Sequence, residues 1–186
     1  MGGESEKYYE EAGIVELTDI VNKLLDVLKI DDIKDMPDAL FDAVINHNTD
    51  VYNAYIEAVD GNLNTDYLQN IYQYYFANRE ELGQDFTPES LAKLLSELTK
   101  DEEEVIDLCS GSGALTIQAW TANPERRFTC YEIDETTVKF LLFNLAVRNI
   151  SGRVYHQDLF DDSKLKIYEI KASEKYSEVQ NVGNNQ

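Results

Sequence analysis

The chain has 186 residues, of which 43% are hydrophobic and 11% aromatic, as in a folded protein with one domain or a small domain plus an extension. Its 36 acidic and 16 basic side chains give a formal net charge of −20 without a basic cluster, which argues against unaided binding to the phosphates of duplex DNA. No apolar run approaches the length of a membrane span and the first residues form no signal segment, so we expect a cytoplasmic protein.

Residues 1–82 have the pattern of a helical N-terminal region. Apolar side chains recur at helical spacing between residues 14 and 28, which predicts an amphipathic helix there. Start signals predict three more helices, over residues 36–45 with Pro37 in the first turn, from Asn48-Thr49-Asp50 to Val59, and from Thr65-Asp66 to Leu82. The tyrosines of the last helix lie on one face, which we interpret as core packing.

Beyond residue 83 short apolar runs alternate with helices. One helix is predicted to begin at Thr87-Pro88. After it, the pattern predicts strands over residues 104–109, 128–131 and 154–156, separated by helices over 114–122 and 135–149. This order indicates an α/β fold with a parallel βαβαβ unit, which is one half of a doubly wound sheet.

The remaining segments carry weaker signals. Residues 165–182 alternate in polarity and predict a terminal hairpin around Ser173-Glu174, and residues 183–186 are predicted to be a disordered tail. Cys109 and Cys130 fall in apolar strand-like runs, which predicts two buried free thiols. The turn over residues 60–64 lacks the Gly and Glu that a calcium loop needs further along, so no metal site is expected.

The first candidate site lies where the strand over 104–109 gives way to a helix. Asp107 precedes the loop Ser110-Gly111-Ser112-Gly113. Glycine lets the backbone approach a ligand, and the helix N-terminus offers N–H groups to a carboxylate. Asp107 can hold a ligand ammonium group or its bridging water. Thr116 stands where a dinucleotide fingerprint needs Gly or Ala, and no phosphate-loop lysine is present.

Two more acids follow the second and third predicted strands. Glu132 can accept both hydroxyls of a ribose, with Ile133 against an adenine ring, and Asp158 can take the adenine amino group. Each acid also has an ordinary interpretation, as a turn former, a solvated strand end or a cap. We favour a ligand site because all three acids occur in order at carboxyl ends of strands.

These segments resemble the cofactor motifs of N6-adenine DNA methylases, and most closely the modification subunit of type I restriction–modification systems. The resemblance runs from Gly83-Gln84-Asp85-Phe86-Thr87-Pro88 through residues 107–113 and 132–134 to Asp158-Leu159-Phe160, and so covers residues 83 to about 160. Asp85 departs from the tyrosine that the family typically carries, whereas the next three residues match.

The resemblance implies a partial Rossmann-like, S-adenosylmethionine-dependent methyltransferase fold over residues 83–182, after the helical region 1–82. It implies that the methionine end of the cofactor meets Phe86, Thr87 and Pro88, and that its amino acid part meets Asp107, Ser110, Gly111 and Gly113. It further implies that the ribose and adenine meet Glu132 and Ile133, and that the adenine also meets Asp158 and Phe160.

The catalytic motif of that family is missing from the 186 residues. The family uses Asn or Asp, two prolines and an aromatic residue to hold a flipped adenine, and no proline follows Phe160. Asn123-Pro124 precedes the second predicted strand, at the sheet edge away from the cofactor motifs, and is interpreted as a turn. We therefore predict no catalytic residue, no DNA methylation by the chain alone, and contact with DNA only through a second methylase or specificity subunit.

Two alternatives stay open at this point. The cofactor half is shared widely, so the chain is alternatively an active methyltransferase of a small-molecule or protein substrate. Its acidic surface alternatively marks a DNA mimic, a decoy protein of a mobile element that blocks a restriction enzyme. Cofactor binding separates the decoy from the other two hypotheses, and a substrate profile separates those two from each other.

Overall fold

The computed structural model describes residues 17–76 and 89–183. Residues 17–28 form a helix, as the apolar spacing predicts. Four further elements of the N-terminal part are the short 3-10 helix η1 (Ile33–Asp35) and the helices α2 (Met36–Ile45), α3 (Thr49–Ala58) and α4 (Tyr67–Tyr75). The predicted helices therefore form, except that α4 ends at Tyr75 and the rest of the predicted span to Leu82 lies outside the described residues.

Two of these helices begin with the residues that the sequence analysis predicted to start them. Asp66 precedes α4, and its carboxylate accepts a hydrogen bond from the Gln69 N–H at 2.9 Å, which satisfies one of the free donors of the first turn. Pro37 occupies the first turn of α2, where its missing N–H costs no helical hydrogen bond.

The second part of the chain is built on five strands. Its elements are α6 (Glu89–Leu98), β1 (Glu104–Asp107), α7 (Ala114–Ala122), β2 (Arg127–Glu132), α8 (Glu135–Val147), β3 (Ser151–Asp158), β4 (Asp161–Lys171) and β5 (Glu178–Gly183). The strands form one sheet in the order β1-β2-β3-β4-β5. β1, β2 and β3 are parallel, and β4 and β5 are added antiparallel. The fold is therefore α/β with a mixed sheet, and the predicted terminal hairpin forms between β4 and β5.

The helix predicted over 135–149 ends at Val147, and the strand predicted over 154–156 extends over Ser151–Asp158. Three further details differ from the sequence-based expectations. The first strand ends at Asp107 and not at Cys109, because the Asp107 carboxylate accepts the Cys109 N–H at 3.4 Å and turns the chain there. Cys109 is consequently exposed, so the expectation of two buried thiols is wrong for it and confirmed for Cys130. Gly183, expected in a disordered tail, is the last residue of β5.

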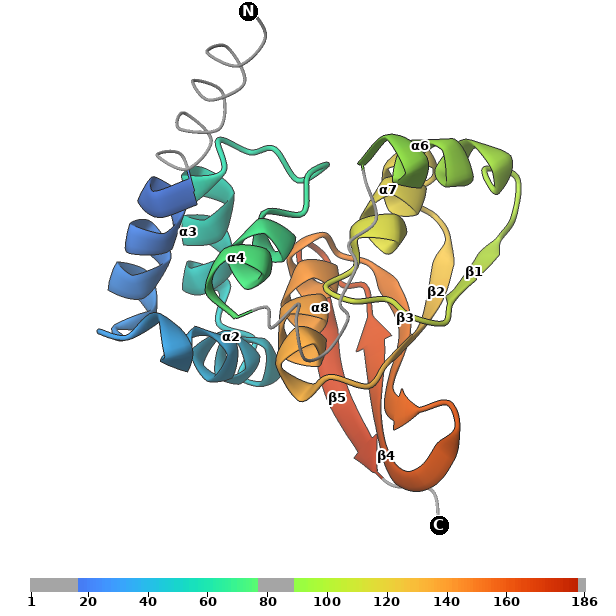
Figure 1. Ribbon diagram of the computed structural model, residues 1–186. Coiled ribbons are helices and arrows are strands. Elements are labelled where there is room, and N and C mark those ends of the chain that lie inside the picture. The colour runs from blue at the N-terminus through green and yellow to red at the C-terminus, as the bar shows by residue number, and fades with distance from the viewer. Residues whose placement is uncertain (1–16, 77–88, 184–186) are drawn as a thin grey trace, which may run out of the picture.

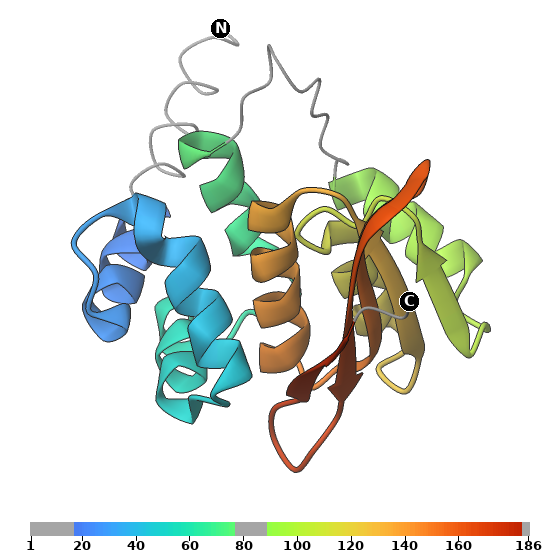
Figure 2. The same ribbon diagram turned by 90° about the horizontal axis from the view of Figure 1, so that it is seen from below.

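Helix α8 lies between the N-terminal helices and the sheet (Figures 1 and 2). Such a helix must be apolar on all sides, and every residue from Thr137 to Val147 except Lys139 is buried. On the outer side, Phe143 packs edge-on against Tyr55 with ring centroids 5.2 Å apart. The buried side chains of both parts, from Ile20 to Val179, consequently form one hydrophobic cluster.

No helix within the described ranges is long and apolar enough to cross a membrane.

Candidate functional site

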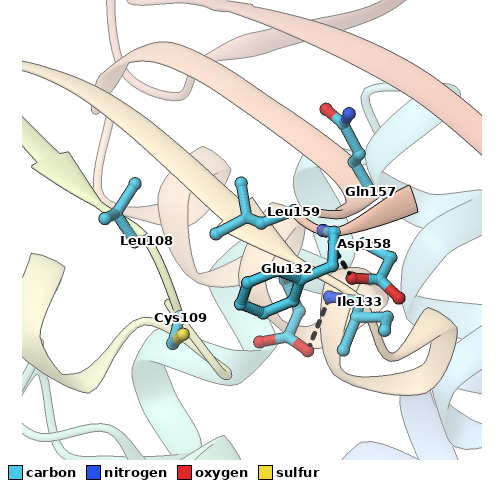
Figure 3. A pocket seen from close by; sticks show the side chains of 8 residues that line it. Leu108, Cys109, Glu132, Ile133, Gln157, Asp158 and Leu159 are labelled. Carbon is cyan, nitrogen blue, oxygen red and sulfur yellow. Dashed lines mark hydrogen bonds between the residues drawn. The ribbon is translucent and has the colours of Figure 1, made fainter. Parts of the chain in front are cut away.

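A pocket lies at the carboxyl ends of β1, β2 and β3. Because parallel strands end at the same edge of a sheet, residues far apart in the sequence meet there. The cavity measures about 320 Å³, near the lower limit of typical ligand sites. Its lining side chains, which Figure 3 shows, are Leu108, Cys109, Glu132, Ile133, Gln157, Asp158, Leu159 and Phe160.

The loop between β1 and α7 depends on its two glycines. Gly111 and Gly113 have φ values of +55° and +105°, in the left-handed region that glycine adopts without strain. A Cβ atom on Gly113 would also lie 2.9 Å from a side-chain carbon of Leu141 in α8. The loop therefore packs closely against α8, and α7 begins directly after the loop, at Ala114.

Glu132 joins this loop to the pocket. Its Oε2 accepts the Gly111 N–H at 2.8 Å, and its Oε1 accepts the N–H groups of Ile133 and Asp134 at 2.9 and 2.8 Å. A carboxylate offers about four acceptor positions, so capacity remains for a ligand hydroxyl. The side chain is thus held in place by backbone donors at the pocket wall, and Figure 3 shows its bond to Ile133.

Asp107 and Ser110 lie behind the pocket and do not line it. The Asp107 carboxylate accepts the hydroxyl of Thr116 at 3.2 Å, and the Ser110 hydroxyl donates to the Asp107 carbonyl oxygen at 3.0 Å. Burial raises the pKa of the Asp107 carboxyl, and the nearby charge of Glu132 raises it further. A cationic group nearby would favour the ionised form and so offset part of the cost of burial.

The third wall of the pocket comes from the end of β3 and the turn into β4. The Asp158 carboxylate accepts the Phe160 N–H at 2.9 Å and so shapes this turn. Phe160 lies at the tip and is 100% exposed, and Leu159 beside it is 43% exposed. Large apolar side chains that are exposed at a cavity form a surface that a flat apolar ligand can cover.

The pocket therefore brings together Glu132, Ile133, Asp158 and Phe160 from the predicted site residues. Asp107, Ser110, Gly111 and Gly113 shape the adjoining loop, and Phe86, Thr87 and Pro88 lie outside the described residues. Sequence reasoning did not assign a role to four lining residues, which are Leu108, Cys109, Gln157 and Leu159. Each of these residues is next to a predicted acid or within two residues of one, which is the signal that points to them.

The charge of the pocket restricts its ligands. Among the residues that the structure describes, its lining includes two carboxylates, those of Glu132 and Asp158, and no basic side chain. An anionic polyphosphate would therefore meet repulsion, whereas a cationic ligand would be attracted. Leu108 and Ile133, 56% and 60% exposed, add apolar surface on two sides. The arrangement suits an organic cation with a diol and a flat ring.

Asn123-Pro124 lies far from this pocket in the fold. The two residues form the turn between α7 and β2, at the amino end of β2. The Asn123 side chain accepts the Glu125 N–H at 3.2 Å, as in a local turn. The pair therefore has a structural role at the amino ends of the strands, opposite the carboxyl ends where the pocket lies.

The sequence profile of the family described as N-6 DNA Methylase matches residues 63–181. The matched region includes α4, the glycine loop, the pocket and the terminal hairpin. No curated protein and no solved structure matches the chain.

Proposed function

The chain belongs to the N-6 DNA methylase family, and from that premise we propose that its pocket binds S-adenosylmethionine. The observation that carries the proposal is the position of Glu132. Its carboxylate lies at the carboxyl end of β2, held by the glycine loop and bordered by exposed apolar side chains of the same cavity. An adenosine with a cationic tail matches this combination of a diol acceptor, an apolar surface and negative charge.

The residues divide among the parts of the cofactor. Glu132 would accept one ribose hydroxyl, Ile133 and Phe160 would cover the adenine, and Asp158 would accept its amino group. The amino acid part would lie toward the glycine loop, where the first-turn N–H groups of α7 suit a carboxylate and Asp107 suits an ammonium group. By resemblance, the methionine end would meet Phe86, Thr87 and Pro88.

The bound cofactor would supply a methyl group on a sulfonium for transfer to adenine N6. The chain would bind and orient the cofactor, as one Rossmann-like half of a methyltransferase sheet. Its 186 residues contain no Asn-Pro-Pro or Asp-Pro-Pro before an aromatic residue. We therefore propose a restriction–modification type protein that methylates DNA only in company with a second methylase or specificity subunit.

The open edge of β1 supports a partner of this kind. Within the described residues β1 pairs only with β2, and Ile106 on it is 62% exposed. Four leucines of the neighbouring helix α6 are also exposed, namely Leu91, Leu94, Leu95 and Leu98. The acidic residues 101–104 lie exposed at the start of the strand. A partner that adds an apolar strand with basic flanking residues would complement this edge.

The chain alone is expected to leave DNA unmethylated. Transfer to N6 requires a flipped adenine held beside the sulfonium, and the net charge of −20 disfavours contact with phosphates. The measurement is incorporation of radiolabelled methyl groups into mixed-sequence duplex DNA, at about 150 mM salt, where nonspecific binding is already weakened. DNA labelling that Asp158→Ala abolishes would contradict the proposal and make the chain a minimal enzyme.

Cysteine reactivity offers a direct test of where the cofactor binds. Cys109 is exposed and lines the pocket, whereas Cys130 is buried, and burial raises its thiol pKa to about 12. A maleimide at about pH 8 is therefore expected to modify only Cys109 in the folded protein. Saturating S-adenosylhomocysteine should slow that modification at least about tenfold, because the ligand covers the pocket.

A displaced cysteine provides the control for this experiment. Thr121 is exposed on α7, away from the pocket, so the double variant Cys109→Ser, Thr121→Cys should react at a rate that the ligand does not change. Modification of Cys109 at the same rate with and without ligand would show that the cofactor does not occupy this cavity.

A further inference from the structure

Ser112 connects the glycine loop to the N-terminal helical part. It stands between the two left-handed glycines, and its hydroxyl donates to Asp66 Oδ2 at 2.7 Å, a contact across 46 residues of sequence. Asp66 is the residue that caps α4. Neither Ser112 nor Asp66 lines the pocket, so the contact lies behind the loop.

Asn144 of α8 completes this contact. Its Nδ2 donates both to Asp66 Oδ1 at 2.8 Å and to the Ser112 carbonyl oxygen at 2.9 Å. Ser112 is therefore held at its hydroxyl and at its carbonyl by two side chains that also bind each other. The exposed fractions of Asp66, Ser112 and Asn144 are 7%, 5% and 0%, so water does not compete for these bonds.

Arg148 balances the buried carboxylate from the other side. It donates to Asn144 Oδ1 at 2.7 Å and to the backbone carbonyl oxygens of Leu63 and Thr65 at 2.8 and 3.0 Å. Burial raises the pKa of the Asp66 carboxyl, while the hydrogen bond from Ser112 and the charge of Arg148 act in the opposite direction. The network that ends on the glycine loop therefore offsets part of the cost of burying this acid.

We propose that Asp66 is a positioning residue for the cofactor loop: through Ser112 it holds residues 110–113 in the conformation that presents Gly111 to Glu132 and the start of α7 to the ligand. The proposal rests on the proposed function, because the loop is a cofactor loop only if the pocket binds S-adenosylmethionine. The N-terminal helical part thereby takes a role in cofactor binding, although Asp66 is 46 residues from Ser112 in the sequence.

The glycine loop needs a positioning residue because its two glycines leave its backbone flexible. Two glycines give the free backbone many conformations, and a ligand that had to order them would lose affinity. Asp66 and Asn144 hold the residue between the glycines at its hydroxyl and at its carbonyl, and so remove that freedom before the ligand arrives. In metal sites, loss of a hydrogen bond that orients a ligating residue costs about 10–100-fold in affinity. We expect a loss at the lower end of that range for this loop.

The test compares Asp66→Ala, Ser112→Ala and their double variant. Calorimetry with S-adenosylhomocysteine is expected to show about tenfold weaker binding for each single variant. The double variant should bind no more weakly than either single variant, because both act through the same contact. Asp66→Asn should restore most of the affinity, since an amide can still accept from Asn144 and donate to the Ser112 hydroxyl.

Hydrogen exchange in the protein without ligand provides a second readout. A peptide covering residues 108–116 should exchange faster in Asp66→Ala than in wild type if Asp66 orders the loop. Gln118→Met is the matched control, since the Gln118 side chain donates to the Asn64 carbonyl oxygen at 2.6 Å and docks the same segment without touching Ser112. It should lower the melting temperature and leave both affinity and loop exchange unchanged.

The outcomes separate the two proposals. Wild type that binds no S-adenosylhomocysteine would overturn the proposed function and the affinity role of Asp66 with it. Wild type that binds, with Asp66→Ala binding equally well, would overturn the positioning role alone. Equal losses of affinity in Asp66→Ala and Gln118→Met would also overturn it, because they would reduce Asp66 to general docking of the helical part.

Discussion

Replacing Glu132 with alanine is expected to weaken S-adenosylhomocysteine binding by about 100-fold, a loss on the order of 2–3 kcal/mol as for hydrogen bonds to a charged group. The wild-type carboxylate would accept one ribose hydroxyl, and its contact with the Gly111 N–H also ties the loop to the pocket. The variant loses both contacts at once. Titration calorimetry measures the change, and thermal unfolding reports whether the fold survives.

Two further variants separate the ligand contact from general effects of charge. Glu132→Gln keeps one acceptor oxygen and should bind between wild type and Glu132→Ala. Glu135→Ala removes a carboxylate three positions away that pairs with Lys166 at 3.2 Å and does not line the pocket, so its affinity should equal that of wild type. Equal affinity in Glu132→Ala and wild type would contradict the assignment of this residue.

Replacing Phe143 with alanine is expected to lower the free energy of unfolding by about 3–5 kcal/mol, as for buried aromatic residues elsewhere. Its ring packs against Tyr52 and Tyr55 of α3, with centroids 5.4 and 5.2 Å away. The side chain is 0% exposed, so the substitution leaves a cavity between the N-terminal helices and α8. Denaturant unfolding, followed by far-ultraviolet circular dichroism and by tyrosine fluorescence, measures the loss.

The unfolding curves from circular dichroism and from tyrosine fluorescence are expected to coincide. Since one hydrophobic cluster spans both parts of the chain, wild type and variant should each unfold in a single transition. Tyr74→Ala, on a side chain 60% exposed, is the control and should change the stability by less than about 0.5 kcal/mol. Two separated transitions in wild type would contradict the shared core.

Local signals made much of the fold predictable from the sequence. Helices α2 and α7 have the predicted bounds because Pro37 marks the first turn of α2 and Gly113 directly precedes α7. The strand around Phe128 was predictable as a short apolar run between two helices, and the strand around Val154 as a short run that follows α8. The same logic placed Glu132 and Asp158 at strand ends, where the pocket lies.

Contacts between distant segments were not predictable in this way. Nothing near Ser112 indicates that Asp66 binds it, because the contact depends on how α4 and α8 pack. The exposure of Cys109 depends on where β1 ends, and a turn made by Asp107 moved that end by two residues. The placement of the N-terminal helices against α8 had one signal in the sequence, the apolar residues on all sides of that helix.

Calorimetric titration of the wild-type chain tests whether its pocket binds S-adenosylmethionine. We expect saturable binding of S-adenosylmethionine and of S-adenosylhomocysteine, and no heat from NAD or ATP, whose phosphates would meet the carboxylates of Glu132 and Asp158 in the pocket. Even a weak site with a dissociation constant of about 1 mM has a binding free energy of roughly 4 kcal/mol. If neither form of the cofactor binds at about millimolar concentration, the pocket is not a site for S-adenosylmethionine.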